Sequence, residues 1–273
     1  MICAVLGPRG TFSEDAAHSY WKADNHLEVA GSIEELFLLL SRGEISDALI
    51  PLENSQAGTI EASMLNLAQH ELSIQGEIYM PIRQYLMGRE VYPLNEIELI
   101  ISQPAVYAQC NEYINKYMPK ARTEICSSTT KAVQIVKNEG KRAAAIGNEK
   151  AASLYGLQVI AQDIQNLNNI TRFIHVSNMA PKIIEADKAS MIFSLANYPG
   201  SLFEALKVFT EYNLNLTKIE SRPDPAHLNN YCFYVDLDVK GQANRMEELI
   251  DKLKKHCLNV KYLGAYPTIT RML

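Results

Sequence analysis

Cysteine is scarce in this sequence, and the cysteines that occur form no pattern. The chain of 273 residues has five, an odd number, widely scattered and without a Cys-x-x-Cys pair. Such thiols are typical of reduced cytosolic proteins, and their spacing argues against a disulfide framework and against the common zinc motifs. The six histidines form neither a His-Glu-x-x-His motif nor a tight cluster with cysteine. We therefore expect no metal site.

Long apolar runs and an excess of positive charge are also missing. No segment approaches the roughly 20 apolar residues of a membrane-spanning helix, and the apolar run Ile2–Leu6 has no basic flank and no cleavage site after it. We therefore expect a cytoplasmic protein with no signal peptide and no membrane partner. With 26 basic and 31 acidic residues the formal net charge is −5, so no overall basic field favours a nucleic acid partner. An anionic ligand would have to be held by local groups.

Short apolar runs alternate with helical patterns over the first part of the chain. Hydrophobic residues make up 47% and charged residues 21%, which is the composition of a globular protein, and the length suits two domains. The run Ile2–Leu6 precedes one expected helix, and Leu27–Ala30 precedes a second over Ile33–Arg42. Ser32 and Glu35 have the spacing of a capping box at the start of that second helix. This alternation predicts an α/β fold.

The alternation continues and then changes toward the C-terminus. Further strands are expected at Ala48–Pro51, Ser73–Tyr79, Leu99–Ser102, Thr123–Ser127, Ala143–Gly147 and Thr171–Val176. We assign the strands that begin near Ser73 to a second α/β unit, and Ser177–Asp187 to a linker. Beyond it the order strand, helix, strand, strand, helix, strand is that of a ferredoxin-like βαββαβ domain. The sequence therefore predicts two domains, residues 1–178 and residues 189–273.

Three polar segments follow or lead into the expected strands. Because open α/β sheets bind ligands at the carboxyl ends of their strands, each is a candidate ligand site: Gly7–Ser13, Pro51–Thr59 and Asn168–Phe173. Alternation along the last strand sends Arg172 to the face opposite its two neighbours. Each segment also has a structural interpretation, as a glycine turn with a helix cap, a solvated turn and, for Arg172, an ion pair.

Several uncommon strings in these segments occur in one order and resemble the prephenate dehydratase family. The strings are GPxGTFSxxAA at Gly7–Ala17, PxENSxxG at Pro51–Gly58 and NxTRF at Asn169–Phe173. Three further strings resemble the family's regulatory ACT domain, at Pro199–Leu202, Asn215–Pro223 and Leu263–Pro267. The resemblance covers nearly the whole chain.

The resemblance implies an enzyme with a substrate cleft. Its catalytic domain would be two α/β lobes built like a type-2 periplasmic binding protein, followed by a ferredoxin-like ACT domain. The implied reaction is the decarboxylating dehydration of prephenate to phenylpyruvate in phenylalanine biosynthesis. It needs no cofactor and no metal, because loss of carbon dioxide and hydroxyl creates an aromatic ring. By position, Thr171, Asn54 and Gln109 are expected to be catalytic. Substrate binding is expected of Thr11, Glu53, Ser55, Arg172 and Phe173.

The chain departs from the family pattern in one segment. Gln103 and Ala105 stand where the family usually has histidine and glutamine, so the roles of those two family side chains are not carried over. Two other functions stay open at this point. An arogenate dehydratase would run the same elimination on the amino analogue, and a non-catalytic ligand sensor would use the same two-lobed architecture.

The ACT strings imply regulation by an amino acid. Phenylalanine is expected to bind between the ACT domains of a homodimer or homotetramer and to inhibit the enzyme. The residues expected to form this site are Pro199, Gly200, Ser201, Leu202, Asn215, Leu216, Thr217, Glu220, Ser221 and Arg222. The structural alternative is a domain that only dimerises through its sheet edge.

Overall fold

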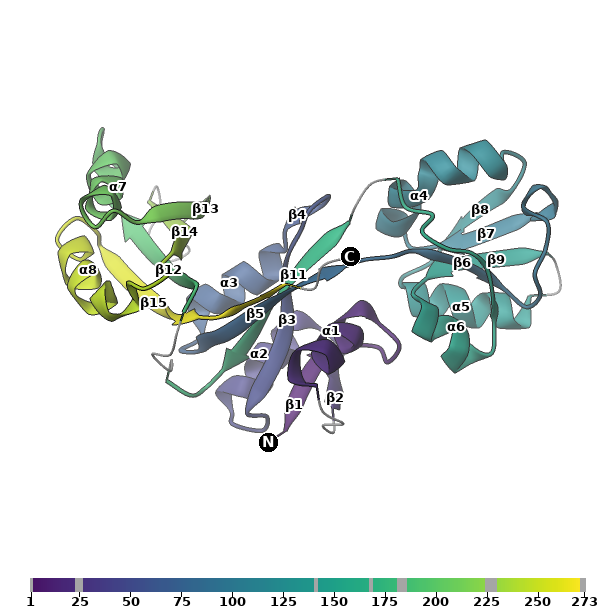
Figure 1. The fold of residues 1–273 in the computed structure, drawn as a ribbon, viewed down its shortest axis with the longest axis horizontal. Helices are drawn as coiled ribbons and strands as arrows, with labels where there is room; N and C mark the ends of the chain where they lie inside the picture. Colours follow the sequence, from purple (N-terminus) through teal and green to yellow (C-terminus); the bar gives the residue numbers. More distant parts are fainter. Residues whose placement is uncertain are drawn as a thin grey trace.

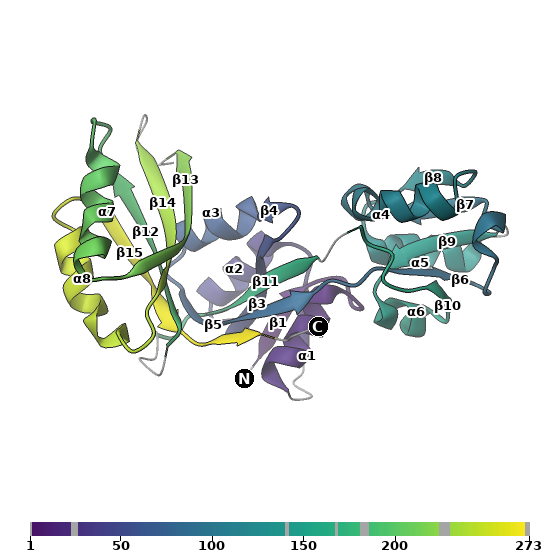
Figure 2. The ribbon, with the colours of Figure 1, turned by 45° about the horizontal axis from the view of Figure 1, so that its top comes forward.

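Three β-sheets organise the chain (Figure 1). The computed structural model describes residues 2–22, 27–139, 142–166, 169–180, 186–223 and 230–270. Two of the sheets form the first and second lobes, and the third forms a C-terminal domain that lies against the first lobe (Figure 2). No helix within these described ranges is long and apolar enough to cross a membrane.

The first lobe is built on a seven-stranded sheet with the order β16-β5-β11-β3-β1-β2, and β4 pairs with β3. Its strands are β1 (Cys3–Leu6), β2 (Leu27–Ala30), β3 (Asp47–Asn54), β4 (Gly58–Thr59), β5 (Ser73–Pro81), β11 (Ile170–Ser177) and β16 (Thr268–Thr270). Its helices are α1 (Phe12–Trp21), α2 (Ile33–Ser41) and α3 (Glu61–Gln69). The expected cap of α2 is present, since the Glu35 N–H donates to Ser32 Oγ at 3.1 Å.

The second lobe has a five-stranded sheet with the order β10-β6-β9-β7-β8. Its strands are β6 (Tyr85–Gly88), β7 (Leu99–Ser102), β8 (Arg122–Ile125), β9 (Ala143–Gly147) and β10 (Gln158–Ala161). Its helices are α4 (Pro104–Tyr117), α5 (Thr129–Asn138) and α6 (Glu149–Tyr155), with a 3₁₀ turn η1 at Leu94–Glu96. Strands β7, β8 and β9 are parallel, which agrees with the strand and helix alternation of the sequence.

The division between the lobes differs from the predicted one. Strand β5, which was assigned to the second unit, lies in the first lobe, where it pairs antiparallel with β11. The chain leaves the first lobe after β5 and returns at β11, so two segments cross between the lobes. Strands β6 and β10, which pair antiparallel in the second lobe, were not predicted. Pairing between distant strands decides this division, and local periodicity carries no information about it.

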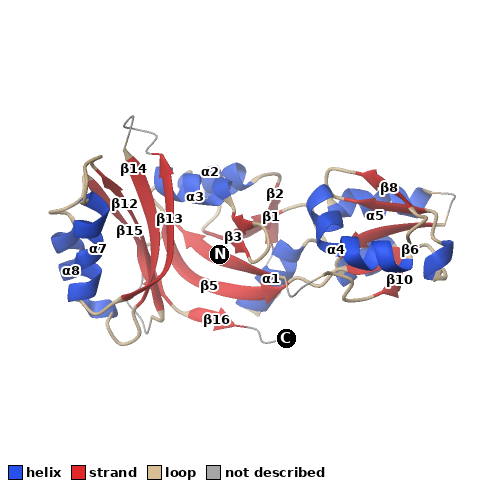
Figure 3. Ribbon diagram, turned by 90° about the horizontal axis from the view of Figure 1, so that it is seen from above, coloured by secondary structure: helices blue, strands red, loops and turns tan. Residues whose placement is uncertain are grey.

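The C-terminal domain has the predicted βαββαβ order. Its strands are β12 (Lys188–Leu195), β13 (Asn215–Pro223), β14 (Tyr231–Asp238) and β15 (Asn259–Tyr266), and its helices are α7 (Ser201–Glu211) and α8 (Met246–Leu253), with a 3₁₀ turn η2 at Ala243–Arg245. The strands form an antiparallel sheet in the order β13-β14-β12-β15, with α7 and α8 on one face (Figure 3). One boundary is corrected: Thr268–Thr270 form β16, which runs parallel to β5 in the first lobe. The C-terminal domain therefore ends before residue 268.

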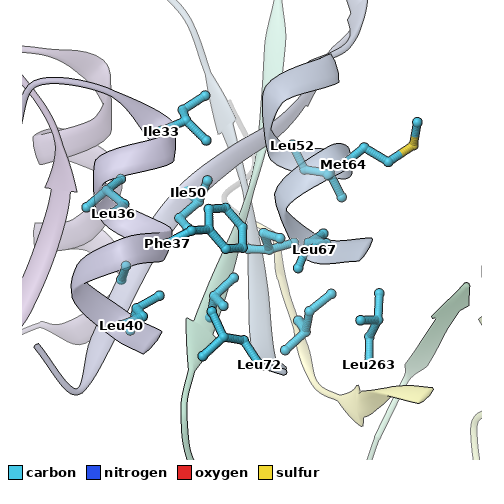
Figure 4. Packing of buried hydrophobic residues seen from close by; sticks show 14 of the residues in the cluster. Ile33, Leu36, Phe37, Leu40, Ile50, Leu52, Met64, Leu67, Leu72 and Leu263 are labelled. Carbon is cyan, nitrogen blue, oxygen red and sulfur yellow. The ribbon is translucent and has the colours of Figure 1, made fainter. Parts of the chain in front are cut away.

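The other face of the C-terminal sheet shares a hydrophobic core with the first lobe. Leu263 of β15 lies in one cluster with Phe37, Leu67 and Leu72, which come from α2, α3 and the segment after α3 (Figure 4). Ile192, Tyr234 and Tyr266 of the same sheet belong to this cluster. Burying apolar area stabilises an interface by roughly 25 cal/mol per Å², so this contact fixes the C-terminal domain on the first lobe.

Candidate active site

Strands β3 and β11 place Asn54 and Thr171 directly opposite each other. The Asn54 Oδ1 atom accepts hydrogen bonds from the N–H groups of Gln56 and Ala57, at 3.0 and 2.9 Å. Because these backbone groups can only donate, the other end of the amide is the NH₂ group. It donates to Thr171 Oγ1 at 2.9 Å. The Thr171 oxygen is thus an acceptor here, and its own hydrogen is available to donate to a ligand.

A second amide extends this arrangement toward the second lobe. Asn54 Nδ2 also donates to Asn169 Oδ1 at 2.6 Å, and Asn169 Nδ2 donates to Gln109 Oε1 at 2.9 Å. Gln109 lies on α4 of the second lobe, and Asn169 on the segment that returns to the first lobe. Asn169 is only 3% exposed and Thr171 only 7%. The three predicted catalytic residues therefore belong to one hydrogen-bond chain that connects the lobes.

Asn169 completes this chain and was not among the predicted site residues. It is the first residue of the NxTRF string, which was the available signal. Ser55 stabilises the same region from the other side, because its Oγ accepts from the Ile170 N–H at 3.0 Å and its N–H donates to the Ile170 carbonyl at 2.9 Å. The Ile82 N–H, on the outgoing crossing segment, donates to the Asn169 carbonyl at 2.7 Å. Both crossing segments are thus hydrogen-bonded at the candidate site.

The first predicted segment forms a turn after β1. Gly7 is required there, since a Cβ atom would lie 2.2 Å from Val29 Cγ1. Thr11 is the N-cap residue of α1, but its hydroxyl donates to the Leu6 carbonyl at 3.2 Å and does not cap the helix. Glu14 instead accepts from the Gly10 N–H at 2.6 Å. Thr11 therefore lies at the carboxyl end of β1 and makes no side-chain cap on α1.

An open groove of about 640 Å³ lies between the two lobes. It is lined by Phe12, Asp15, His18, Ser19, Met80, Pro81, Arg83, Tyr85, Asn148, Glu149 and Lys150. Met80 is the cross-strand neighbour of Thr171, so the two side chains lie on the same face of the sheet. The volume falls in the range of about 300–1,000 Å³ that is typical of small-molecule sites. Thr171, Asn54 and Gln109 do not themselves line the groove, and Thr171 is connected to it through its strand neighbour Met80.

One acidic residue joins the lobes across this groove. Asp15 on α1 pairs with Lys150 Nζ at 2.5 Å and accepts from Asn148 Nδ2 at 2.9 Å. Asn148 is the N-cap of α6, where its Oδ1 accepts from the Ala151 N–H at 2.9 Å. The groove thus brings the start of α1 and the start of α6 together, and helix N-termini favour anionic groups.

Three residues predicted to bind substrate have structural contacts. Arg172 is 2% exposed, and its guanidinium donates to Glu77 at 2.6 Å and to Asp236 at 2.5 Å. Phe173 is also 2% exposed and packs in the core beneath α1. Glu53 pairs with Lys218 of the C-terminal domain at 2.9 Å. The ion-pair interpretation of Arg172 is therefore the one the structure supports, and burial argues against direct substrate contact for Arg172 and Phe173. Substrate binding by Glu53, whose side chain is 36% exposed, stays a prediction.

Charge in this buried cluster is balanced, because Lys188 Nζ lies 2.6 Å from Glu77 Oε1 and adds a second cation to the two carboxylates. Burial alone would raise the pKa of Asp236, but the Arg172 guanidinium and the hydrogen bonds from Arg172 and Ser190 outweigh it and lower that pKa. Ser190 Oγ donates to Asp236 Oδ1 at 2.5 Å, and Tyr234 Oη donates to Ser190 Oγ at 3.1 Å. Asp236 is therefore ionised and fully hydrogen-bonded at neutral pH.

The predicted regulatory residues lie at two ends of the C-terminal sheet. Pro199–Leu202 follow β12 and start α7, where Gly200 has a φ of +95°. Strand pairing aligns the end of β12 with the end of β13, near Arg222. Asn215–Thr217 therefore lie at the opposite end, about 20–25 Å away at roughly 3.3 Å per residue. One copy of the chain does not bring the two segments into a single site.

Fold and site together define a two-lobed α/β domain with a polar interlobe site and an attached ferredoxin-like domain. Residues 3–181 match the family described as prephenate dehydratase, and residues 190–257 match the ACT domain family. The chain therefore belongs to the prephenate dehydratase family and carries an ACT domain.

Known relatives agree with this assignment. The chain is 34% identical over 272 residues to a prephenate dehydratase of Methanocaldococcus jannaschii, covering 95% of this chain and 96% of the relative. It is 33% identical over 284 residues to an arogenate dehydratase/prephenate dehydratase of Arabidopsis thaliana chloroplasts, covering 99% and 74%. Among solved structures, prephenate dehydratase from Arthrobacter aurescens in complex with L-Phe superimposes with a TM-score of 0.88 at 30% identity, covering 98% and 90%.

Proposed function

We propose that this protein removes water and carbon dioxide from prephenate to give phenylpyruvate. The observation that carries the proposal is the Thr171 hydroxyl, which accepts from Asn54 at 2.9 Å and lies on the strand next to Met80 of the interlobe groove. An accepted hydrogen bond orients the remaining Thr171 hydrogen toward a ligand. The elimination needs such a donor at the departing hydroxyl, because that oxygen gains negative charge as its bond to carbon breaks.

The residues present divide the chemistry among themselves. A threonine hydroxyl is too weak an acid to act as a free proton source, so Thr171 serves as an oriented donor to the leaving oxygen. Asn54 fixes that orientation. Asn169 bonds both Asn54 and Gln109, so the second lobe, which carries Gln109, also holds Asn54 in place. Arg83 and Lys150 line the groove, where Lys150 pairs with Asp15 and Arg83 lies 3.7 Å from Asp163, so a substrate carboxylate would exchange with one of these carboxylates. Aromatisation of the ring provides the driving force.

Turnover of purified protein tests this proposal. We expect conversion of prephenate to phenylpyruvate without added metal or cofactor, followed by the absorbance of the product. The same assay with arogenate separates the two dehydratase activities, since a protein that turns over arogenate much faster is an arogenate dehydratase. A folded protein that binds either compound without turnover would be a ligand sensor, and the proposal would be wrong.

We propose further that phenylalanine binds at the C-terminal domain of a homodimer and inhibits the enzyme in the cytoplasm. Support comes from the two predicted ligand-binding segments, Pro199–Leu202 and Asn215–Thr217, which lie at opposite ends of one sheet, so a complete site requires a second copy. Strand β13 lies at the sheet edge, where such a copy has access. The relative from Arthrobacter aurescens is described in complex with L-Phe. Sedimentation with and without phenylalanine, together with inhibition of turnover, tests both parts, and cell fractionation tests the location.

A further inference from the structure

The strand pair that carries Thr171 and Asn54 continues directly into the contact with the C-terminal domain. In the β3–β11 register, Thr171 lies opposite Asn54, and the next pair is Arg172 opposite Glu53. Successive side chains of a strand point to opposite faces of the sheet. The first pair therefore lies on the sheet face of Met80, which lines the groove, and the second faces the C-terminal domain, one residue away.

Arg172 is held by the C-terminal sheet through buried polar groups. Its Nη1 atom donates to Asp236 Oδ2 at 2.5 Å and its Nη2 atom to Tyr266 Oη at 3.1 Å. Asp236, on β14, is fully buried. Moving Asp236 alone would leave its carboxylate buried without this cation, which is strongly unfavourable, whereas Arg172 would keep Glu77 of β5 as a partner at 2.6 Å. Arg172 is therefore held jointly by β5 of the first lobe and β14 of the C-terminal domain.

Glu53, whose side chain is 36% exposed, is held by β13. Lys218 Nζ lies 2.9 Å from Glu53 Oε1 and donates to Thr59 Oγ1 at 2.8 Å. Thr59 Oγ1 in turn donates to Glu220 Oε2 at 3.1 Å. Glu53 and Thr59 flank the turn that begins with Asn54 and pair with each other across it. Strand β13 thus contacts both sides of the turn that orients Thr171.

We propose that Lys218 and Asp236 are positioning residues: by holding the Glu53–Arg172 pair from the C-terminal domain, they set the geometry of the Asn54–Thr171 pair. This inference rests on the proposed function, because it assigns those two residues a role in the same reaction. Neither Lys218 nor Asp236 lines the groove, so both act through the strand pair. A displacement of about 1 Å at the reacting groups is enough to lower a rate by about 10²-fold. A ligand that shifts β13 and β14 would therefore reach Thr171 without moving the second lobe.

A matched pair of lysine variants tests the inference in the full-length protein. Lys218 and Lys261 both lie on the C-terminal sheet, contact the first lobe and have side chains that are 12% exposed. Lys261 Nζ donates to the Ala68 and His70 carbonyls at 3.2 and 2.5 Å, at the end of α3. We expect Lys218→Met to lower kcat for prephenate by roughly 10- to 100-fold with KM changed by less than about threefold, and Lys261→Met to keep kcat within about twofold.

Two further variants separate positioning from general destabilisation. Lys218→Arg keeps the charge and should restore kcat to within about threefold of the parent protein, and melting temperatures of Lys218→Met and Lys261→Met show whether kcat follows stability. Glu53→Gln combined with Lys218→Met should lower kcat about as much as either change alone, because both remove one interaction. If Lys218→Met does not fold, Glu53→Gln is compared with Lys261→Met in its place.

The outcomes distinguish this inference from the proposed function. A parent protein that turns over neither prephenate nor arogenate overturns both. An active parent whose Lys218→Met and Lys261→Met variants have the same kcat overturns the positioning role and leaves the proposed function standing. The positioning role is also overturned if Lys218→Met and Lys261→Met lose the same kcat and the same thermal stability.

Discussion

Replacing Thr171 by valine removes one hydroxyl and keeps the shape of the side chain. The hydroxyl oxygen accepts from Asn54 Nδ2, which has a second acceptor in Asn169 Oδ1. The variant therefore leaves one N–H of Asn54 without its acceptor in a mostly buried place. Losing such a bond costs about 1–3 kcal/mol, which is less than the free energy of unfolding of about 5–15 kcal/mol that is usual for a protein. The Thr171→Val protein should fold.

The effect on turnover should be much larger. A positioned proton or hydrogen-bond donor contributes roughly 10²- to 10⁴-fold, which corresponds to about 3–5 kcal/mol of transition-state stabilisation at 1.36 kcal/mol per tenfold. Because the donor acts on the departing hydroxyl, we expect kcat to fall while KM changes little. Thr171→Ala should behave in the same way. Thr171→Ser keeps the hydroxyl and should retain kcat within about tenfold.

Steady-state kinetics of the three variants, with circular dichroism to verify folding, check this reasoning. Near-normal kcat in a folded Thr171→Val protein would show that the donor to the leaving group lies elsewhere. A fall in kcat/KM that is entirely a rise in KM would show that Thr171 binds substrate without acting on the leaving oxygen.

Three other predictions concern separate parts of the molecule. Gln109→Ala should lower kcat more than Gln103→Ala, because Gln109 bonds Asn169 at 2.9 Å and Gln103 stands in place of a family histidine; the opposite order of kcat would contradict the assignment of α4. Burial raises the pKa of Asp47, but hydrogen bonds from His175, Ser46 and Ser177 outweigh burial and lower that pKa below 3.8. The contribution of ionised Asp47 to stability is therefore complete above about pH 4 and is lost as the pH falls further. Urea unfolding between pH 3 and 7 should therefore show Asp47→Asn less stable than the parent at pH 7, with a difference that narrows below about pH 4; a constant difference would refute this. Gly7→Ala should lower the melting temperature, since its Cβ would lie 2.2 Å from Val29 Cγ1, and an unchanged value by calorimetry would mean that the turn relaxes freely.

Local sequence patterns were sufficient for most elements and for part of the site. The Ser32 and Glu35 spacing predicted the start of α2, and the observed cap bond confirms it. Alternation along β11 predicted that Arg172 faces away from Thr171, as it does. The motif strings indicated Asn54, Thr171 and Gln109, which the structure joins through Asn169. These features depend on residues close together in the chain, and side-chain periodicity and capping are properties of such short segments.

Only the tertiary structure decided which distant segments meet. Arg172 and Asp236 are 64 residues apart in sequence, so nothing in the NxTRF string indicates the buried partner that removes Arg172 from the substrate. The pairing of β5 with β11, and of β16 with β5, places strands in the first lobe that sequence order assigned elsewhere. Strand pairing and ion-pair partners depend on which surfaces the whole chain buries together, and many distant segments have the same local pattern. For that reason the sequence determined the elements and the candidate residues of this protein, whereas the packing of the C-terminal sheet on the first lobe decided that Arg172 is buried in an ion-pair cluster.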